Sequence, residues 1–111
     1  MVAYLDTSAL VKLVVRESES PALRDWIATR REPCATSMLA HTELLRAVRR
    51  SDPQLTGQAH ALLESLHLLA VPPAVFRLAA TLEPAELRSL DALHLAAARQ
   101  LAEQLTAFVS Y

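Results

Sequence analysis

The sequence contains very little of what builds phosphate-binding loops, disulfides or broad basic surfaces. Among its 111 residues there is one glycine, Gly57, and one cysteine, Cys34. A single glycine excludes the glycine-rich loops that cradle phosphates. A single cysteine excludes an intrachain disulfide framework and favours a reducing compartment, which we take to be the cytoplasm. The formal charge of −1 provides no general attraction for nucleic acid, so a protein of this composition that handles a polyanion needs local cationic groups or metal ions.

Long apolar runs are also absent. No stretch approaches the roughly 20 apolar residues that span a bilayer. The first apolar run, "VAYL", meets Asp6 too soon to be a signal peptide, so we expect no membrane segment. Apolar residues nevertheless make up 52% of the chain, with Ala and Leu dominant, which favours helices around a packed core. The length suits one domain spanning residues 1–111.

Short apolar runs alternate with helical patterns along the chain. Alternation of this kind predicts βαβ crossovers and an α/β fold, with a parallel sheet of about four short strands between two layers of helices. Ligands of such sheets bind at the carboxyl ends of the strands. The expected strands are 2–5, 33–36, 67–71 and 107–111, and the expected helices are 6–15, 21–30, 38–50, 54–66, 73–82 and 89–104.

Two acidic residues stand where functional groups of such folds lie. Asp6 directly follows "VAYL" and therefore ends the first strand, although Asp is also a common helix cap. Asp91 stands near the start of the nearly apolar helix "LDALHLAAA", where the helix dipole or Arg88 would also stabilise a carboxylate. Taken singly, each residue fits a structural role as well as a functional one.

A third acid, Glu43, lies in helix 38–50 with Ala40 and Ala47 as its neighbours on the helix face. The structural alternative is an exposed pair with Arg46. The parallel sheet would let Asp6, Glu43 and Asp91 converge at one end. Converging carboxylates repel one another, and a hard divalent cation such as Mg²⁺ relieves that repulsion. One or two such cations activate water for the cleavage of phosphodiesters.

Three stretches, "YLDTSALVKL", "TELLRAVRR" and "LRSLDALHLAAA", occur in this order and together resemble the motifs of the PIN-domain ribonucleases. More narrowly they resemble the VapC toxins of type II toxin–antitoxin systems, and the resemblance covers essentially the whole chain. It implies a three-layer α/β/α PIN-like fold and an endoribonuclease dependent on Mg²⁺ or Mn²⁺, which hydrolyses RNA with cation-activated water. A VapB-like antitoxin would neutralise the activity, and a homodimer is expected.

The same resemblance assigns roles to individual residues. Asp6, Glu43 and Asp91 would be the catalytic and metal-binding acids. Thr7 and Ser8 match a small hydroxyl residue near the first acid, which would orient Asp6 or hold a water.

The end of the sequence departs from the family's pattern. In the family, the last strand is usually followed by a fourth acid, in a pattern like Val-Thr-Tyr-Asp. Here "FVSY" matches the first three positions, with Ser110 at the hydroxyl position, and the sequence has no residue 112 for the acid. We therefore expect a C-terminally truncated domain without the fifth strand and last helix, with apolar surface and a strand edge exposed. The alternative function is a catalytically impaired PIN module that acts mainly by binding the antitoxin.

Two further sets of residues bear on function. Arg46, Arg49 and Arg50 form a basic cluster at a helix end, where they either complement the helix dipole or contact RNA phosphates. His94 follows Asp91 at a spacing that suits a metal ligand, but a histidine in an apolar helix is more often packed, and we expect packing. A phospho-acceptor receiver module is the rival of another class. It needs paired acids after the first strand and a lysine after the last, and no lysine follows Lys12.

Overall fold

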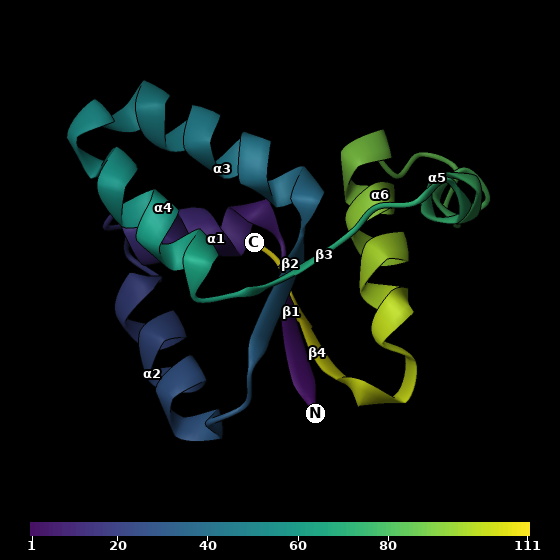
Figure 1. The fold of residues 1–111 in the computed structure, drawn as a ribbon, viewed down its shortest axis with the longest axis horizontal. Helices are drawn as coiled ribbons and strands as arrows, with labels where there is room; N and C mark the ends of the chain where they lie inside the picture. Colours follow the sequence, from purple (N-terminus) through teal and green to yellow (C-terminus); the bar gives the residue numbers. More distant parts are fainter.

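A four-stranded parallel sheet forms the centre of the protein. The computed structural model describes residues 1–111, and its strands lie in the order β3-β2-β1-β4 (Figure 1). Every neighbouring pair is parallel, with Tyr4 opposite both Ala35 and Phe108. The strands are β1 (Val2–Leu5), β2 (Cys34–Ser37), β3 (His67–Leu69) and β4 (Leu105–Val109). The predicted parallel sheet of four short strands is confirmed.

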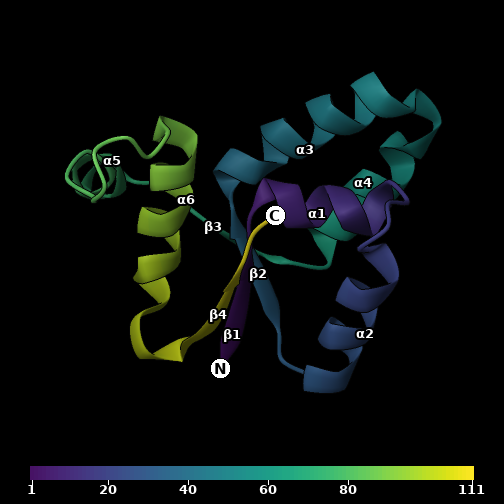
Figure 2. The ribbon, with the colours of Figure 1, turned by 180° about the vertical axis from the view of Figure 1, so that it is seen from behind.

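Helices cover both faces of this sheet, so the predicted three-layer arrangement is also confirmed. Helices α1 to α4 lie on one side and α5 and α6 on the other (Figures 1 and 2). The helices are α1 (Thr7–Val14), α2 (Ser20–Arg30), α3 (Met38–Ser51), α4 (Thr56–Glu64), α5 (Pro73–Ala79) and α6 (Ser89–Ala98), with 3₁₀ turns η1 (Pro53–Leu55) and η2 (Arg99–Gln104). No helix combines the length and the hydrophobicity that a membrane span requires.

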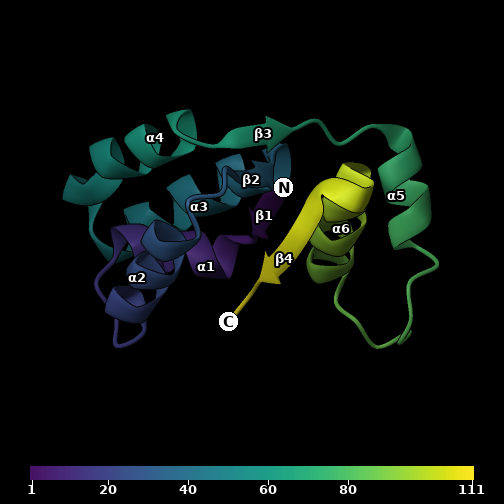
Figure 3. The ribbon, with the colours of Figure 1, turned by 90° about the horizontal axis from the view of Figure 1, so that it is seen from below.

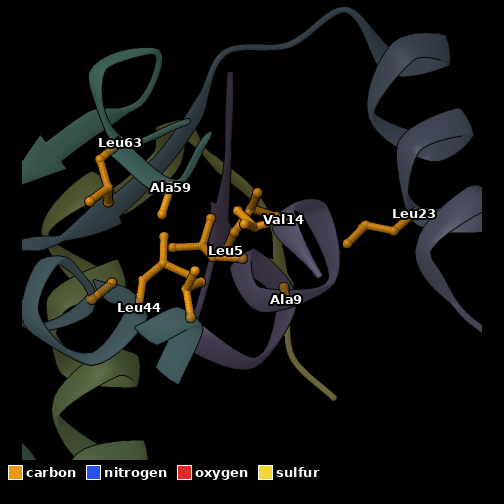
Figure 4. Packing of buried hydrophobic residues seen from close by; sticks show 10 residues of the cluster. Leu5, Ala9, Val14, Leu23, Leu44, Ala59 and Leu63 are labelled. Atoms are coloured by element: carbon orange, nitrogen blue, oxygen red, sulfur yellow. The ribbon is translucent and has the colours of Figure 1, made fainter. Parts of the chain in front are cut away.

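The alternation of side chains along β1 divides the core in two. Leu5 points into a cluster formed with α1 to α4, which includes Leu10 and Leu44 (Figure 4). Tyr4 points to the opposite face and packs with Val75 of α5 and with the alanines of α6. Successive residues of a strand face opposite sides of the sheet, so this one short strand, buried along its whole length, anchors both helical layers.

The last predicted helix is shorter than expected. The pattern predicts a helix over 89–104, but α6 ends at Ala98 and the chain continues as the 3₁₀ turn η2. Ala102 has a positive φ of 50° with ψ −125°, which ends helical geometry and turns the chain into β4. Helix α5 is also shorter than the predicted 73–82 and ends at Ala79. A turn follows it, in which the Thr81 hydroxyl donates to the Leu78 carbonyl.

Strand β4 lies at the edge of the sheet and pairs only with β1 (Figure 3). A cavity of about 460 Å³ lies between the end of β4 and helix α2. Trp26 of α2 lines this cavity, and Arg30 stacks on its ring at 4.5 Å. The cavity is otherwise lined by Ala22, Leu23 and residues 107–111, so it is almost entirely apolar.

Candidate active site

Two of the three predicted acids line one cavity at the carboxyl end of the sheet. Asp6 directly follows β1, and Asp91 projects from the first turn of α6. Ser110 joins them because β4, which it follows, runs parallel to β1 and ends beside it. The cavity has a volume of about 230 Å³ and is lined by Asp6, Leu87, Arg88, Asp91, Leu95, Phe108, Ser110 and Tyr111.

Asp6 caps helix α1 with one carboxylate oxygen and leaves the other one without a protein donor. Its side chain is buried, with the residue only 6% exposed. Oδ1 accepts hydrogen bonds from the Ala9 amide at 3.2 Å and the Ser8 hydroxyl at 2.6 Å. Ser8 in turn accepts from the Tyr111 amide at 2.8 Å. The cap and a ligand function therefore use different oxygens of Asp6, and Ser8 lies where the resemblance places a residue that orients it.

Asp91 lies beside the helix N-terminus and Arg88, the two features that would stabilise it in a structural role. It lies in the first turn of α6, and the Arg88 Nε donates to its Oδ2 at 3.3 Å. The two side chains are 88% and 44% exposed. An ion pair this exposed contributes about 1 kcal/mol or less, so Arg88 leaves Asp91 available to a cation that enters the cavity.

Glu43 is held in a different way from the other two acids. It makes no ion pair with Arg46, the partner suggested by the helical spacing. Instead, its Oε1 accepts from the Thr7 hydroxyl at 2.8 Å and pairs with His94 Nε2 at 2.7 Å. Glu43 does not line the cavity that Asp6 and Asp91 share. Thr7 follows Asp6 in the sequence and so ties the third acid to the same end of the sheet.

His94 is packed, as predicted, but it also belongs to a hydrogen-bonded network that the sequence did not predict. It is 3% exposed, as expected of a packed side chain, but both ring nitrogens have polar partners. Nδ1 lies 2.7 Å from the Tyr4 hydroxyl oxygen, which lies 3.0 Å from Ser37 Oγ. Burial raises the pKa of Tyr4 to about 12, so its hydroxyl stays neutral. The available signal was that His94 is the only polar residue in "ALHLAAA".

The cavity suits a hard divalent cation held by few protein ligands. No group of three or more His, Cys, Asp or Glu side chains lies close enough to hold a metal ion. Asp6 and Asp91 provide oxygen ligands on one cavity, however. Mg²⁺ commonly binds through one or two carboxylates while it keeps several waters and contacts substrate phosphates. The donor chemistry of these two residues therefore fits Mg²⁺ or Mn²⁺. Glu43 is not among the residues that line this cavity.

The arginine cluster forms a separate basic hollow on helix α3. Arg46, Arg49 and Arg50 alone line a cavity of about 400 Å³. All three residues are exposed, and none forms an ion pair with an acidic side chain. Unpaired guanidinium groups in the last turns of a helix can complement its dipole and can also bind phosphate oxygens.

Comparison with known proteins identifies the family. Residues 3–108 match the PIN domain family. Ribonuclease VapC47 of Mycobacterium tuberculosis (strain CDC 1551 / Oshkosh) is 48% identical over 112 residues, which cover 97% of this chain and 82% of the relative. The chain belongs to the PIN-domain family, in its VapC group. Ribonuclease VapC46 of M. tuberculosis (strain ATCC 25618 / H37Rv) is 44% identical to this PIN domain over 108 residues, with the same coverage of 97% and 82%.

Solved structures share the fold of this PIN domain. VapC20 of M. tuberculosis, described as a Sarcin-Ricin loop cleaving toxin, superposes with a TM-score of 0.81 at 15% identity over 98% of this chain and 88% of that one. VapBC2 of Rickettsia felis, bound to a DNA fragment from their promoter, gives a TM-score of 0.73 at 18% identity over 100% and 88%. The family predicted from the three sequence motifs is confirmed. The prediction of a truncated domain stays a prediction.

Proposed function

We propose that this PIN domain is an endoribonuclease toxin that depends on Mg²⁺ or Mn²⁺ and is neutralised by a VapB-like antitoxin. The observation that carries the proposal is the cavity on which Asp6 and Asp91 both open. Ser8 and Ala9 occupy only Oδ1 of Asp6, so Oδ2 is available to a cation. The ribonuclease names of relatives more than 40% identical support the reaction class.

Each residue of the site has a distinct task in this proposal. Asp6 and Asp91 hold the cation, and Ser8 keeps the Asp6 carboxylate in place through its 2.6 Å hydrogen bond. When bound, the cation activates water and offsets the negative charge of the phosphodiester. Ser110 lines the same cavity and can hydrogen bond to the RNA backbone or to a water. Glu43 is the third acid of the set, and Thr7 and His94 fix its position.

The arginine cluster provides the contact with RNA that the net charge does not. Arg46, Arg49 and Arg50 have no acidic partners and surround one hollow of α3. Helix α3 also carries Glu43, so one helix bears both the third acid and the proposed phosphate contacts. Contacts of this kind position RNA without reading its sequence.

The partners follow the same family relationship. We expect a VapB-like antitoxin, consistent with the VapBC2 complex among the structural neighbours, and a second copy of this chain. Phe76 of α5 and Leu90 of α6 are 50% and 49% exposed, and a homodimer would cover apolar surface of this sort. Cys34 is a free thiol, which suits the cytoplasm.

A second candidate is a PIN module that mainly binds the antitoxin. The lack of a three-ligand metal cluster and the apolar cavity between α2 and the open edge of β4 favour it. An extended apolar peptide could pair with an open strand edge and place side chains in such a cavity.

RNA cleavage after removal and return of the cation separates the two candidates. The purified chain should lose cleavage in EDTA and regain it with Mg²⁺, whereas Asp6→Asn should stay inactive throughout. Asp25→Asn, on the exposed face of α2, is the matched control and should behave like wild type. A chain that cleaves no RNA under either condition yet binds the antitoxin would favour the binding module.

A further inference from the structure

A row of hydrogen-bonded polar side chains crosses the sheet beside the active-site cavity. It runs from Ser37 to Tyr4 at 3.0 Å, from Tyr4 to His94 at 2.7 Å, from His94 to Glu43 at 2.7 Å, and from Glu43 to Thr7 at 2.8 Å. These residues come from β2, β1, α6, α3 and α1, so the row joins both helical layers through the sheet. Buried polar networks of this kind specify one arrangement of their members when every group is satisfied.

The end of this row at Glu43 is asymmetric. Thr7 and His94 both bond to Oε1, and no protein group donates to Oε2. The Glu43 side chain is 27% exposed, so Oε2 is accessible. Asp6 shows the same arrangement, with Ser8 and Ala9 on Oδ1 and no donor on Oδ2.

His94 can hold Glu43 because its own ring is fixed. It is buried on α6, and its ring meets that of Tyr4 edge-on, with 5.9 Å between centroids. Tyr4 stacks in turn on Phe108, with 5.3 Å between centroids. An ionised carboxylate only accepts hydrogen bonds, so the Nε2 proton faces Glu43 and Nδ1 is left to the Tyr4 hydroxyl.

We propose that His94 is a positioning residue that, together with Thr7, immobilises Oε1 of Glu43 and leaves Oε2 free to accept a hydrogen bond from a water of the cation. This inference rests on the proposed function and deepens it. Glu43 is then an outer-shell partner of the cation, and the loss of such partners typically changes metal affinity or activity about 10- to 100-fold. His94 itself contacts neither cation nor RNA in this scheme.

Two substitutions that differ only in reach test the proposal. His94→Gln places an amide N–H near the position of Nε2 and can still donate to Glu43. His94→Asn carries the same amide on a shorter side chain, which reaches toward Tyr4 but not to Glu43. In calorimetric titration with Mn²⁺ and no RNA, His94→Asn should bind about 10- to 100-fold more weakly than wild type. His94→Gln should stay within about threefold of it, and RNA cleavage should follow the same order.

Further variants make each outcome decisive. His60→Asn, at an exposed position of α4, should leave Mn²⁺ affinity unchanged. Thr7→Val removes the other donor to Oε1, and should weaken Mn²⁺ binding even if the His94 variants do not fold. A purely structural role would lower the melting temperature of His94→Asn without changing its Mn²⁺ affinity, and that result overturns the proposal. Equal affinities for wild type and Thr7→Val would do the same. Failure of the proposed function looks different, because the wild type itself would then bind no Mn²⁺, and the inference would fall with it.

Discussion

Substitutions of Asp6 separate its two tasks, because each task uses a different carboxylate oxygen. Asn and Asp are nearly equivalent helix caps, and Asp6→Asn keeps an acceptor for the Ala9 amide. Its free energy of unfolding should therefore stay within about 0.5 kcal/mol of wild type. Asp6→Ala removes the acceptor and should cost about 1 kcal/mol, which lowers the melting temperature by about 4 °C in a domain of this size.

The ability of Asp6 to bind a cation, in contrast, should be lost in both variants alike. Both variants lose the anionic oxygen, so both should lose RNA cleavage by at least about 100-fold, equivalent to about 2.7 kcal/mol of transition-state stabilisation. Mn²⁺ at about 100 times its dissociation constant should stabilise the wild type by about 2.7 kcal/mol and stabilise neither variant. Thermal unfolding with and without Mn²⁺, together with a fluorescent RNA assay, measures all of these quantities. If Asp6→Asn cleaves RNA at the wild-type rate and gains the same Mn²⁺ stabilisation, then Asp6 is a helix cap only.

Three further predictions concern other parts of the molecule. Tyr4→Phe removes the hydroxyl that bonds to Nδ1 of His94 and Oγ of Ser37, so it should lose about 1–3 kcal/mol of stability in urea unfolding; an unchanged midpoint would contradict the hydrogen bonds assigned to Tyr4. Arg49→Ala should raise the RNA dissociation constant and reduce the slope of log affinity against log salt by about 1, with no change in melting temperature; an unchanged slope would remove Arg49 from the RNA surface. A hydrogen bond from the Thr106 hydroxyl lowers the pKa of Glu32, and a hydrogen bond from Arg30 lowers it further. A lowered carboxyl pKa adds stability above the group's ordinary pKa, and that stability is lost as pH falls through the lowered value. Thr106→Val should therefore be less stable than wild type at neutral pH. The difference in melting temperature between the two proteins should shrink as the pH is lowered from about 6 to about 3; a difference that does not change with pH would contradict this.

The fold could be predicted because the sequence encodes it locally. "VAYL" is apolar along its whole length, as a strand buried on both faces is, and the helices between the apolar runs favour parallel connections. The ends of the helices were harder to place. Nothing in the Ala-rich run before Leu105 reveals that α6 ends at Ala98, because Ala102, which completes the turn with a positive φ, is not a glycine.

The candidate site could be predicted only in part, because its geometry depends on contacts between distant segments. The positions of Asp6 and Asp91 follow from where their strand and helix begin and end. The partner of Glu43 does not, since helical spacing pointed to Arg46 whereas the structure pairs Glu43 with His94, 51 residues away. A buried histidine in an apolar helix gives no local sign of which carboxylate it faces. Only the packing of α6 against the sheet decides that contact.

The dependence of RNA cleavage on Mg²⁺ concentration, measured for wild type beside Asp91→Asn, tests the central claim most directly. The claim is that Asp6 and Asp91 hold one divalent cation in the cavity that they share. Because Asp91 is half exposed and its Arg88 pair is weak, the substitution should leave the melting temperature of the metal-free protein unchanged. We predict cleavage that rises with Mg²⁺ and saturates in the wild type, and no Mg²⁺-dependent cleavage in Asp91→Asn. Equal Mg²⁺ dependence in the two proteins would contradict the assignment of the cavity as the metal centre.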